Sequence, residues 1–261
     1  MIRLGSIPRW LFIVLIAMGC SMLLAGQPAL DPSHAPLTHL LKEHMRDGRV
    51  DYPALTQDRR GLDDYLAETA AVSKATFDSW PKPDQLAFLI NVYNASTLRL
   101  VRDNYPVTSI RKIGGLFTSP WKLDSVQLWG QSFSLDHVEH TLIRKNFPDP
   151  RVHFALVCAA RGCPPLRPQA YVGATLNPDL DEQGRLFMAQ SDKNRVDRQS
   201  GILWLSPIFD WYSKDFTKEG KTISEAITPW LPSDVAQYVR STRLNVRFTE
   251  YDWSLNDIPK P

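Results

Sequence analysis

The sequence has few cysteines, no basic stripe and no phosphate-binding loop. It holds 3 cysteines in 261 residues, and Cys158 and Cys163 lack the Cys-x-x-Cys spacing of thioredoxin-like sites. Lys and Arg number 30 against 28 Asp and Glu, and the basic residues are scattered. This pattern argues against nucleic acid as a partner. No internal repeat, low-complexity tract or Gly-rich loop is present. We therefore expect no cofactor and no metal.

The N-terminus has the pattern of an export signal. Residues 1–9 hold two arginines and no acid, and residues 10–26 are almost unbroken apolar sequence. The run is short for a bilayer span, which needs about 20 residues. Three alternatives remain open: a signal cleaved near Ala25 or Ala29, an uncleaved anchor, and a lipoprotein modified at Cys20. We expect an exported, periplasmic or envelope-anchored protein that meets the membrane only through this segment.

The remaining chain is predicted to fold as one α+β domain. Residues 1–26 form the signal or anchor, 27–36 a linker and 37–261 the globular domain, because 43% apolar residues suffice for a core. Hydrophobic spacing predicts helices over 37–45, 62–69, 84–105, 135–146, 176–188, 206–212 and 222–231. It also predicts hairpins over 126–133 and 195–205 and a buried strand over 151–157. The fold class is a small mixed or antiparallel sheet packed by several helices.

Two amides lie within the apolar helix predicted over 84–105. Asn91 and Asn94 are surrounded by apolar residues, and a buried amide without partners costs about 1–3 kcal/mol. They either pin a neighbouring loop or line a ligand pocket. As site residues we assign them to ligand binding.

The segment 137–166 contains the side chains that could carry chemistry. Glu139 falls on the apolar arc of its predicted helix, and His140 lies at the margin of that arc. On a strand over 151–157, His153 and Cys158 would point to opposite faces. Cys158 would therefore need His140 or another base to supply a thiolate. A papain-like order is excluded because no histidine follows Cys163.

The turn after Cys158 could support an acyl-transfer site. Its backbone N–H groups could face an oxyanion, and Arg161 would add positive charge. The alternatives for Cys158 and Cys163 are a disulfide, a zinc site with His153 or His140, and a redox pair.

Several blocks of sequence resemble one protein family. These are QLAFLINVYNA at 85–95, NYPV at 104–107, LDHVEH at 135–140, DPRVHFALVC at 149–158, GCPPL at 162–166 and LSPIFDWY at 205–212. In this order they resemble the domain of unknown function 547 family. The resemblance implies signature positions for Asn91, Asn94, Glu139, His140, Arg144, His153 and Cys158. A distant kinship to papain- or transglutaminase-like enzymes is compatible with it only in a permuted arrangement.

Two functions remain open. The first is an exported thiol-dependent hydrolase or acyl transferase for amide or peptide-like substrates. Its nucleophile would be Cys158, its base His140 or His153, and its orienting group Glu139. Arg144 and Arg161 would contact the ligand. The second is a non-catalytic envelope protein that binds a small-molecule or peptide-like ligand or a partner, with Cys158 and Cys163 as a structural pair.

Overall fold

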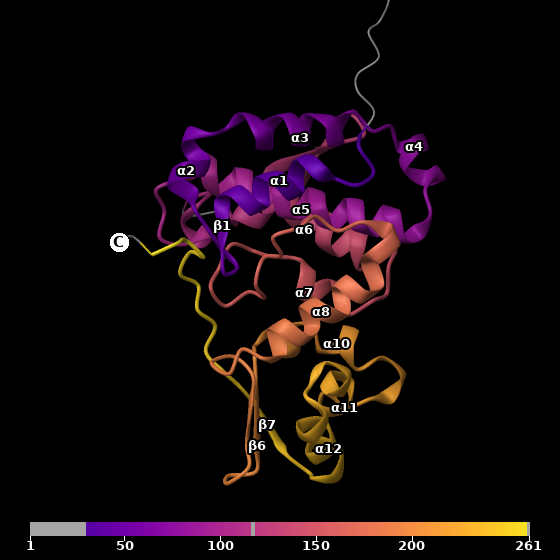
Figure 1. Ribbon diagram of the computed structural model, residues 1–261, viewed down its shortest axis with the longest axis vertical. Coiled ribbons are helices and arrows are strands. Elements are labelled where there is room, and N and C mark those ends of the chain that lie inside the picture. The colour runs from indigo at the N-terminus through magenta and orange to yellow at the C-terminus, as the bar shows by residue number, and fades with distance from the viewer. Residues whose placement is uncertain (1–29, 116–117, 260–261) are drawn as a thin grey trace, which may run out of the picture.

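The computed structural model describes residues 30–115 and 118–259; the predicted signal segment lies outside them. Figure 1 shows the helices of the N-terminal half above a smaller C-terminal part. The first elements are α1 (Ala35–His44), β1 (Met45–Arg46), β2 (Arg49–Val50), α2 (Tyr52–Gln57), α3 (Arg60–Ala71), α4 (Lys74–Ser79), α5 (Lys82–Asn104), η1 (Ile110–Lys112), η2 (Pro120–Lys122), β3 (Asp124–Leu128), β4 (Gln131–Ser134), α6 (Leu135–His137), η3 (Val138–Ile143) and α7 (Val152–Ala155). Then follow η4 (Gly173–Thr175), α8 (Leu176–Met188), β5 (Arg195–Asp197), β6 (Ile202–Leu205), α9 (Ile208–Trp211), α10 (Ser213–Phe216), η5 (Lys218–Gly220), α11 (Ile223–Ile227), η6 (Thr228–Trp230), α12 (Ser233–Ser241) and β7 (Asn245–Phe248).

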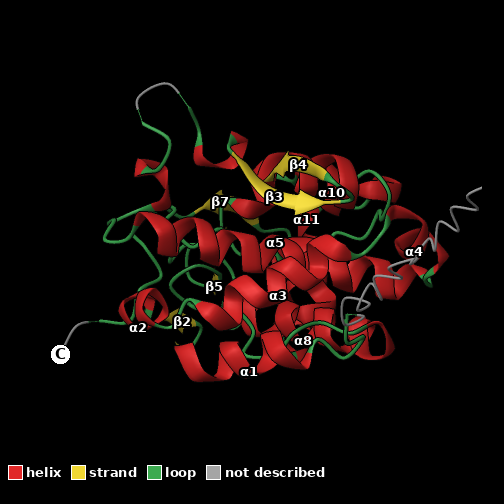
Figure 2. Ribbon diagram, turned by 90° about the horizontal axis from the view of Figure 1, so that it is seen from above, coloured by secondary structure: helices red, strands yellow, loops and turns green. Residues whose placement is uncertain are grey.

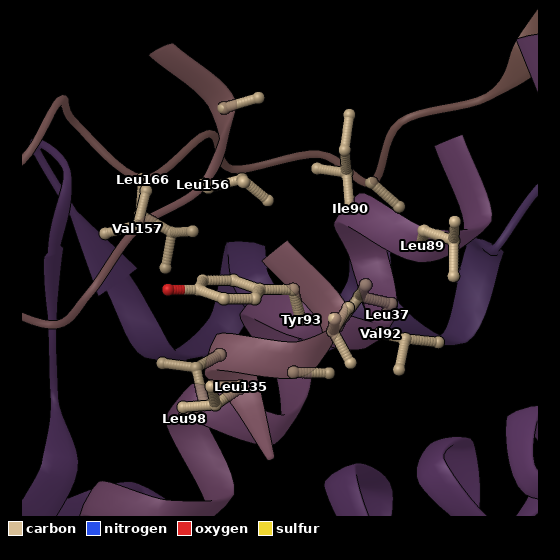
Figure 3. Packing of buried hydrophobic residues seen from close by; sticks show 14 of the residues in the cluster. Leu37, Leu89, Ile90, Val92, Tyr93, Leu98, Leu135, Leu156, Val157 and Leu166 are labelled. Carbon is tan, nitrogen blue, oxygen red and sulfur yellow. The ribbon is translucent and has the colours of Figure 1, made fainter. Parts of the chain in front are cut away.

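Helix α5 is the central element of the larger core. Every residue from 85 to 98 is buried, as its apolar sequence predicts, and α2 and α3 pack against it. Figure 2 shows α3 beside α5. In Figure 3 the ring of Tyr93 lies among Leu98, Leu135, Leu156 and Val157, which come from different parts of the chain. The helix thus supplies a fixed wall for residues brought by later segments.

The C-terminal part has its own cluster of buried aromatic side chains. Phe154, Phe187, Phe209, Phe216 and Trp230 pack together from α7, α8, α9, α10 and η6. Beside them lies a three-stranded sheet in the order β5-β6-β7, with β5 antiparallel and β7 parallel to β6. The predicted mixed α+β class with small sheets is confirmed. None of the described helices is long and apolar enough to cross a bilayer.

The predicted strand over 151–157 is wrong, because residues 152–155 form the short helix α7. Its start is marked in the sequence by Asp149-Pro150: the Asp149 side chain accepts from the backbone N–H of Arg151 at 2.9 Å, and the fixed φ of proline suits a helical turn. An apolar run of this length does not distinguish a buried strand from a buried helix. The chain becomes extended only at Leu156.

The helix predicted over 135–146 begins as expected but changes its winding. Ser134 caps it, accepting from the backbone N–H of His137 at 3.1 Å. From Val138 to Ile143 it is a π-helix, and the N–H of Arg144 bonds to the carbonyl of Glu139, five residues earlier. π-turns inside helices are frequent at functional sites. This turn carries Glu139 and His140.

Candidate functional site

A cavity of about 220 Å³ lies where α5, η3, α7, α9 and the segment 251–253 meet. Its wall contains Glu139, His140, His153 and Cys158, the four side chains predicted to be catalytic. Tyr93 contributes from α5. The structure therefore brings together all four residues, although the predicted strand alternation had placed His153 and Cys158 on opposite faces. Their catalytic role stays a prediction.

Glu139 is a buried carboxylate held by two tyrosines. The hydroxyl of Tyr212 donates to its Oε1 at 2.6 Å, and the hydroxyl of Tyr93 donates to its Oε2 at 3.2 Å. Burial, and then the charge of Glu139, raise the pKa of both tyrosines, so both remain O–H donors at neutral pH. Glu139 is only 8% exposed. The carboxylate is thus fixed in place at the wall of the cavity.

His140 is oriented by its neighbours on the same turn. Arg144 donates from Nη1 to Nδ1 of His140 at 2.7 Å. Since arginine has no acceptor, Nδ1 must be unprotonated and the imidazole carries its proton on Nε2. That nitrogen lies 3.3 Å from a carboxylate oxygen of Asp136. In this arrangement Nδ1 of His140 accepts from Arg144, and a role of this nitrogen as general base requires it to leave Arg144.

His153 is buried against Tyr212 and bonded to Asp215. Its ring stacks on Tyr212 at 3.8 Å between centroids, and its Nε2 lies 2.8 Å from Oδ2 of Asp215. Arg144 donates from Nε to the same oxygen at 2.7 Å. The hydrogen bond from His153, together with Arg144, holds the pKa of Asp215 below its usual range, and burial lowers the pKa of His153. His153 is therefore neutral and donates from Nε2. Arg144 positions these groups and is not among the residues that line the cavity.

Cys158 and Cys163 are joined as a disulfide at one side of the cavity, with Cα atoms 6.4 Å apart. The N–H of Cys158 donates to the sulfur of Cys163 at 3.0 Å. The hydroxyl of Tyr251 lies 3.1 Å from this sulfur and 3.2 Å from that of Cys158. Within residues 30–115 and 118–259, neither sulfur has an imidazole nitrogen as a hydrogen-bond partner.

The expected oxyanion site in the turn after Cys158 is not formed by its later N–H groups. Arg161 donates to the carbonyl of Ser254 at 2.9 Å, and Gly162 donates to that of Asp252 at 2.8 Å. These amides pair with backbone and are not directed at the cavity. Arg161 lines a second, more polar hollow, which shares Cys163, Pro164 and Tyr251 with the first cavity.

Asn91 and Asn94 hold later segments against α5. The Asn91 amide donates to the carbonyl of Tyr171 at 2.7 Å and accepts from its N–H at 2.9 Å. Asn94 donates to the carbonyl of Ala155 and accepts from the N–H of Val157, both at 2.9 Å. Neither amide lines the cavity beside Glu139, and these contacts agree with the alternative in which the amides pin a neighbouring segment. A direct role in ligand binding stays a prediction.

Sequence reasoning missed the aromatic side chains at the cavity. Trp121, Trp211, Trp253 and Tyr251 line it, and Trp211 is 49% exposed. Ring centroids are 4.8 Å apart for Trp211 and Tyr251 and 4.5 Å for Tyr251 and Trp253. Trp211 stands in the LSPIFDWY block, which was a usable signal. Tyr251 and Trp253 had none, because they follow the last predicted helix.

A group elsewhere could hold a metal ion. Glu43, His44 and Asp58 each offer a ligand atom, and these atoms lie within 4.8 Å of one another. Nε2 of the buried His44 lies 3.5 Å from Oδ2 of Asp58. None of the three lines the cavity beside Glu139.

Residues 77–188 match the model of the family described as "Protein of unknown function, DUF547", and this match supports the resemblance that the sequence blocks predicted. The matched stretch contains Glu139, His140, His153 and Cys158. It ends before Trp211, Tyr251 and Trp253 of the cavity wall. No curated protein and no solved structure matches the chain.

Proposed function

We propose that this protein is an exported binding protein that holds a small organic molecule in the cavity beside Glu139, with the Cys158–Cys163 disulfide in the cavity wall. The observation that carries the proposal is the preorganised wall: the polar groups of Glu139, His140 and His153 are each fixed by other protein groups beside open space. Binding sites commonly combine such fixed polar groups with aromatic surface. Export rests on the apolar segment that precedes the domain.

The contacts of the wall favour binding over thiol chemistry. A nucleophilic Cys158 needs a free thiolate and a base within about 3.5 Å. Its sulfur is bonded to Cys163 and neighbours the Tyr251 hydroxyl, which is not a base because burial raises its pKa. Both cavity histidines donate to carboxylates or accept from arginine.

A library of small molecules tests the proposal, with binding followed by ligand-observed NMR and by thermal shift. Ligands of the cavity should lose about tenfold or more in affinity with Trp211→Ala, because a half-exposed stacking ring is removed. The matched control is Phe248→Ala on β7, which removes a ring that is 38% exposed away from the cavity. A library without any ligand that distinguishes the two variants would refute the proposal.

Export is tested by N-terminal sequencing of protein recovered from the envelope. We expect a mature chain that begins shortly after Ala25 or Ala29, or at a lipidated Cys20. An intact N-terminus on protein confined to the cytosol would contradict it.

A thiol-dependent hydrolase or acyl transferase for amide or peptide-like substrates is the second candidate. One observation favours it: Cys158 shares its cavity with His140 and Glu139. This reaction would require an added thiol reductant to open the disulfide and transfer of the Cys158 thiol proton to His140 after it leaves Arg144. The thiolate would then form a thioester with the carbonyl carbon as the C–N bond breaks, His140 would return the proton to the departing amine, and water or an acyl acceptor would cleave the thioester. Turnover of amide substrates after reduction, abolished by Cys158→Ser in a folded protein, would support this candidate. Equal behaviour of reduced wild type and Cys158→Ser would exclude it.

A further inference from the structure

The charge of the cavity is negative although the protein is slightly basic. Among the described residues that line it are Asp136 and Glu139 and no lysine or arginine. The formal net charge of the chain is +2, so this acidity is a local feature. The guanidinium of Arg144 lies nearby, but its Nε and Nη1 are committed to Asp215 and His140. A ligand in the cavity therefore meets carboxylates in the wall, while Arg144 and Arg111 lie outside the residues that line it.

The hydrogen-bond donors to the Glu139 carboxylate are neutral. Its two hydrogen bonds come from tyrosine hydroxyls, and the neutral imidazole of His140 lies 3.9 Å away. In the part of the chain that the structure describes, no lysine or arginine forms an ion pair with this carboxylate. A buried charge is costly unless an opposite charge accompanies it. Arg144 acts on Glu139 through space but forms no ion pair with it, and a cationic ligand would supply an opposite charge in direct contact.

The aromatic side chains of the cavity offer the second half of a cation site. Trp211, Tyr251 and Trp253 lie against one another, with Trp211 and Trp253 stacked at 5.8 Å between centroids. The face of an aromatic ring attracts organic cations within about 6 Å. Within the protein, the guanidinium of Arg111 already lies 5.1 Å from the ring of Trp253. Weakly hydrated cations suit such a surface best.

We infer that the ligand of this cavity is an organic cation with a quaternary ammonium or guanidinium group. Its charge lies beside Glu139, and its apolar part packs against Trp211, Tyr251 and Trp253. This inference rests on the proposed binding function and narrows it to one chemical class.

Two pairs of probes of matched shape test the inference by isothermal titration and by tryptophan fluorescence. They are choline with its neutral isostere 3,3-dimethylbutan-1-ol, and butylguanidinium with butylurea. We expect at least one cation to bind about tenfold or more tightly than its isostere. Glu139→Gln should remove that difference, while Asp64→Asn, which removes an exposed acid of α3, should leave it intact.

The outcomes distinguish failure of the cationic-ligand inference from failure of the proposed binding function. Equal binding of a cation and its isostere, or cation binding that survives Glu139→Gln, overturns the inference and leaves a general binding site in place. The same holds if the probes fail and the library yields only neutral or anionic ligands. A library with no cavity ligand refutes the binding function itself. If Glu139→Gln does not fold, Asp136→Asn replaces it, because the Asp136 side chain is 45% exposed. This substitution should weaken binding of the cation and leave binding of its neutral isostere unchanged.

Discussion

Replacing Asn94 by alanine should cost more stability than most single substitutions in this protein. Asn94 is 6% exposed and closes two hydrogen bonds of 2.9 Å with the backbone of Ala155 and Val157. The substitution leaves a carbonyl and an N–H unpaired in a dry environment, at about 1–3 kcal/mol each. Since both groups lose their partner at once, we expect the free energy of unfolding to fall by about 2–6 kcal/mol.

The assay is equilibrium unfolding in urea, followed by fluorescence and far-UV circular dichroism. Asn104→Ala is the matched control, because Asn104 is an exposed amide of the same helix that donates only to the carbonyl of Leu100. It should change stability by about 0.5 kcal/mol or less. A loss below about 1 kcal/mol for Asn94→Ala would refute the reasoning. Unchanged stability with weakened ligand binding would instead assign Asn94 to the ligand.

Three further predictions concern pH, packing and thiol chemistry. Burial lowers the pKa of His34 from 6.5 to about 4. The stability that the neutral imidazole gives the folded state is therefore present above pH 6.5 and is lost as the pH falls toward 4. His34→Gln should reduce the difference in the free energy of unfolding between pH 7 and pH 4 by about 3 kcal/mol. An unchanged difference in chemical denaturation at the two pH values would contradict this. Gly162→Ala should lower stability by about 1–3 kcal/mol and weaken cavity ligands, because its Cβ would lie 2.8 Å from ring atoms of Tyr251; an unchanged melting temperature would contradict this. Iodoacetamide should label Cys158 and Cys163 only after reduction, as judged by peptide mass spectrometry, and labelling without reductant would argue for free thiols.

The sequence predicted those elements whose cause is local. Helix α5 was predictable because its apolar residues extend around the whole helix between Pro83 and Pro106, and α8 because its apolar residues recur at helical spacing. The π-turn at Glu139 was not, because its winding depends on what the turn packs against. The strand predicted over 151–157 was wrong because the spacing of apolar residues in this short run favours neither a strand nor a helix.

For the candidate site, nearness in sequence was informative. Glu139, His140, His153 and Cys158 lie within 20 residues and meet in one cavity. The remaining wall is assembled by contacts over long separations, such as Tyr212 with Glu139 and Tyr251 with Cys163. No local pattern specifies such contacts, and single-sequence reasoning missed them. The expected base His140 is instead changed by a local contact, because Arg144, four residues later, donates to its Nδ1.

The most direct measurement of the central claim is a crystal structure of the protein with the tightest cation from the probe pairs. The account predicts that the ligand lies in the cavity with its charged group beside the carboxylate of Glu139 and its apolar part on Trp211. A ligand bound outside this cavity, or one whose charged group points away from Glu139 into solvent, would contradict the account.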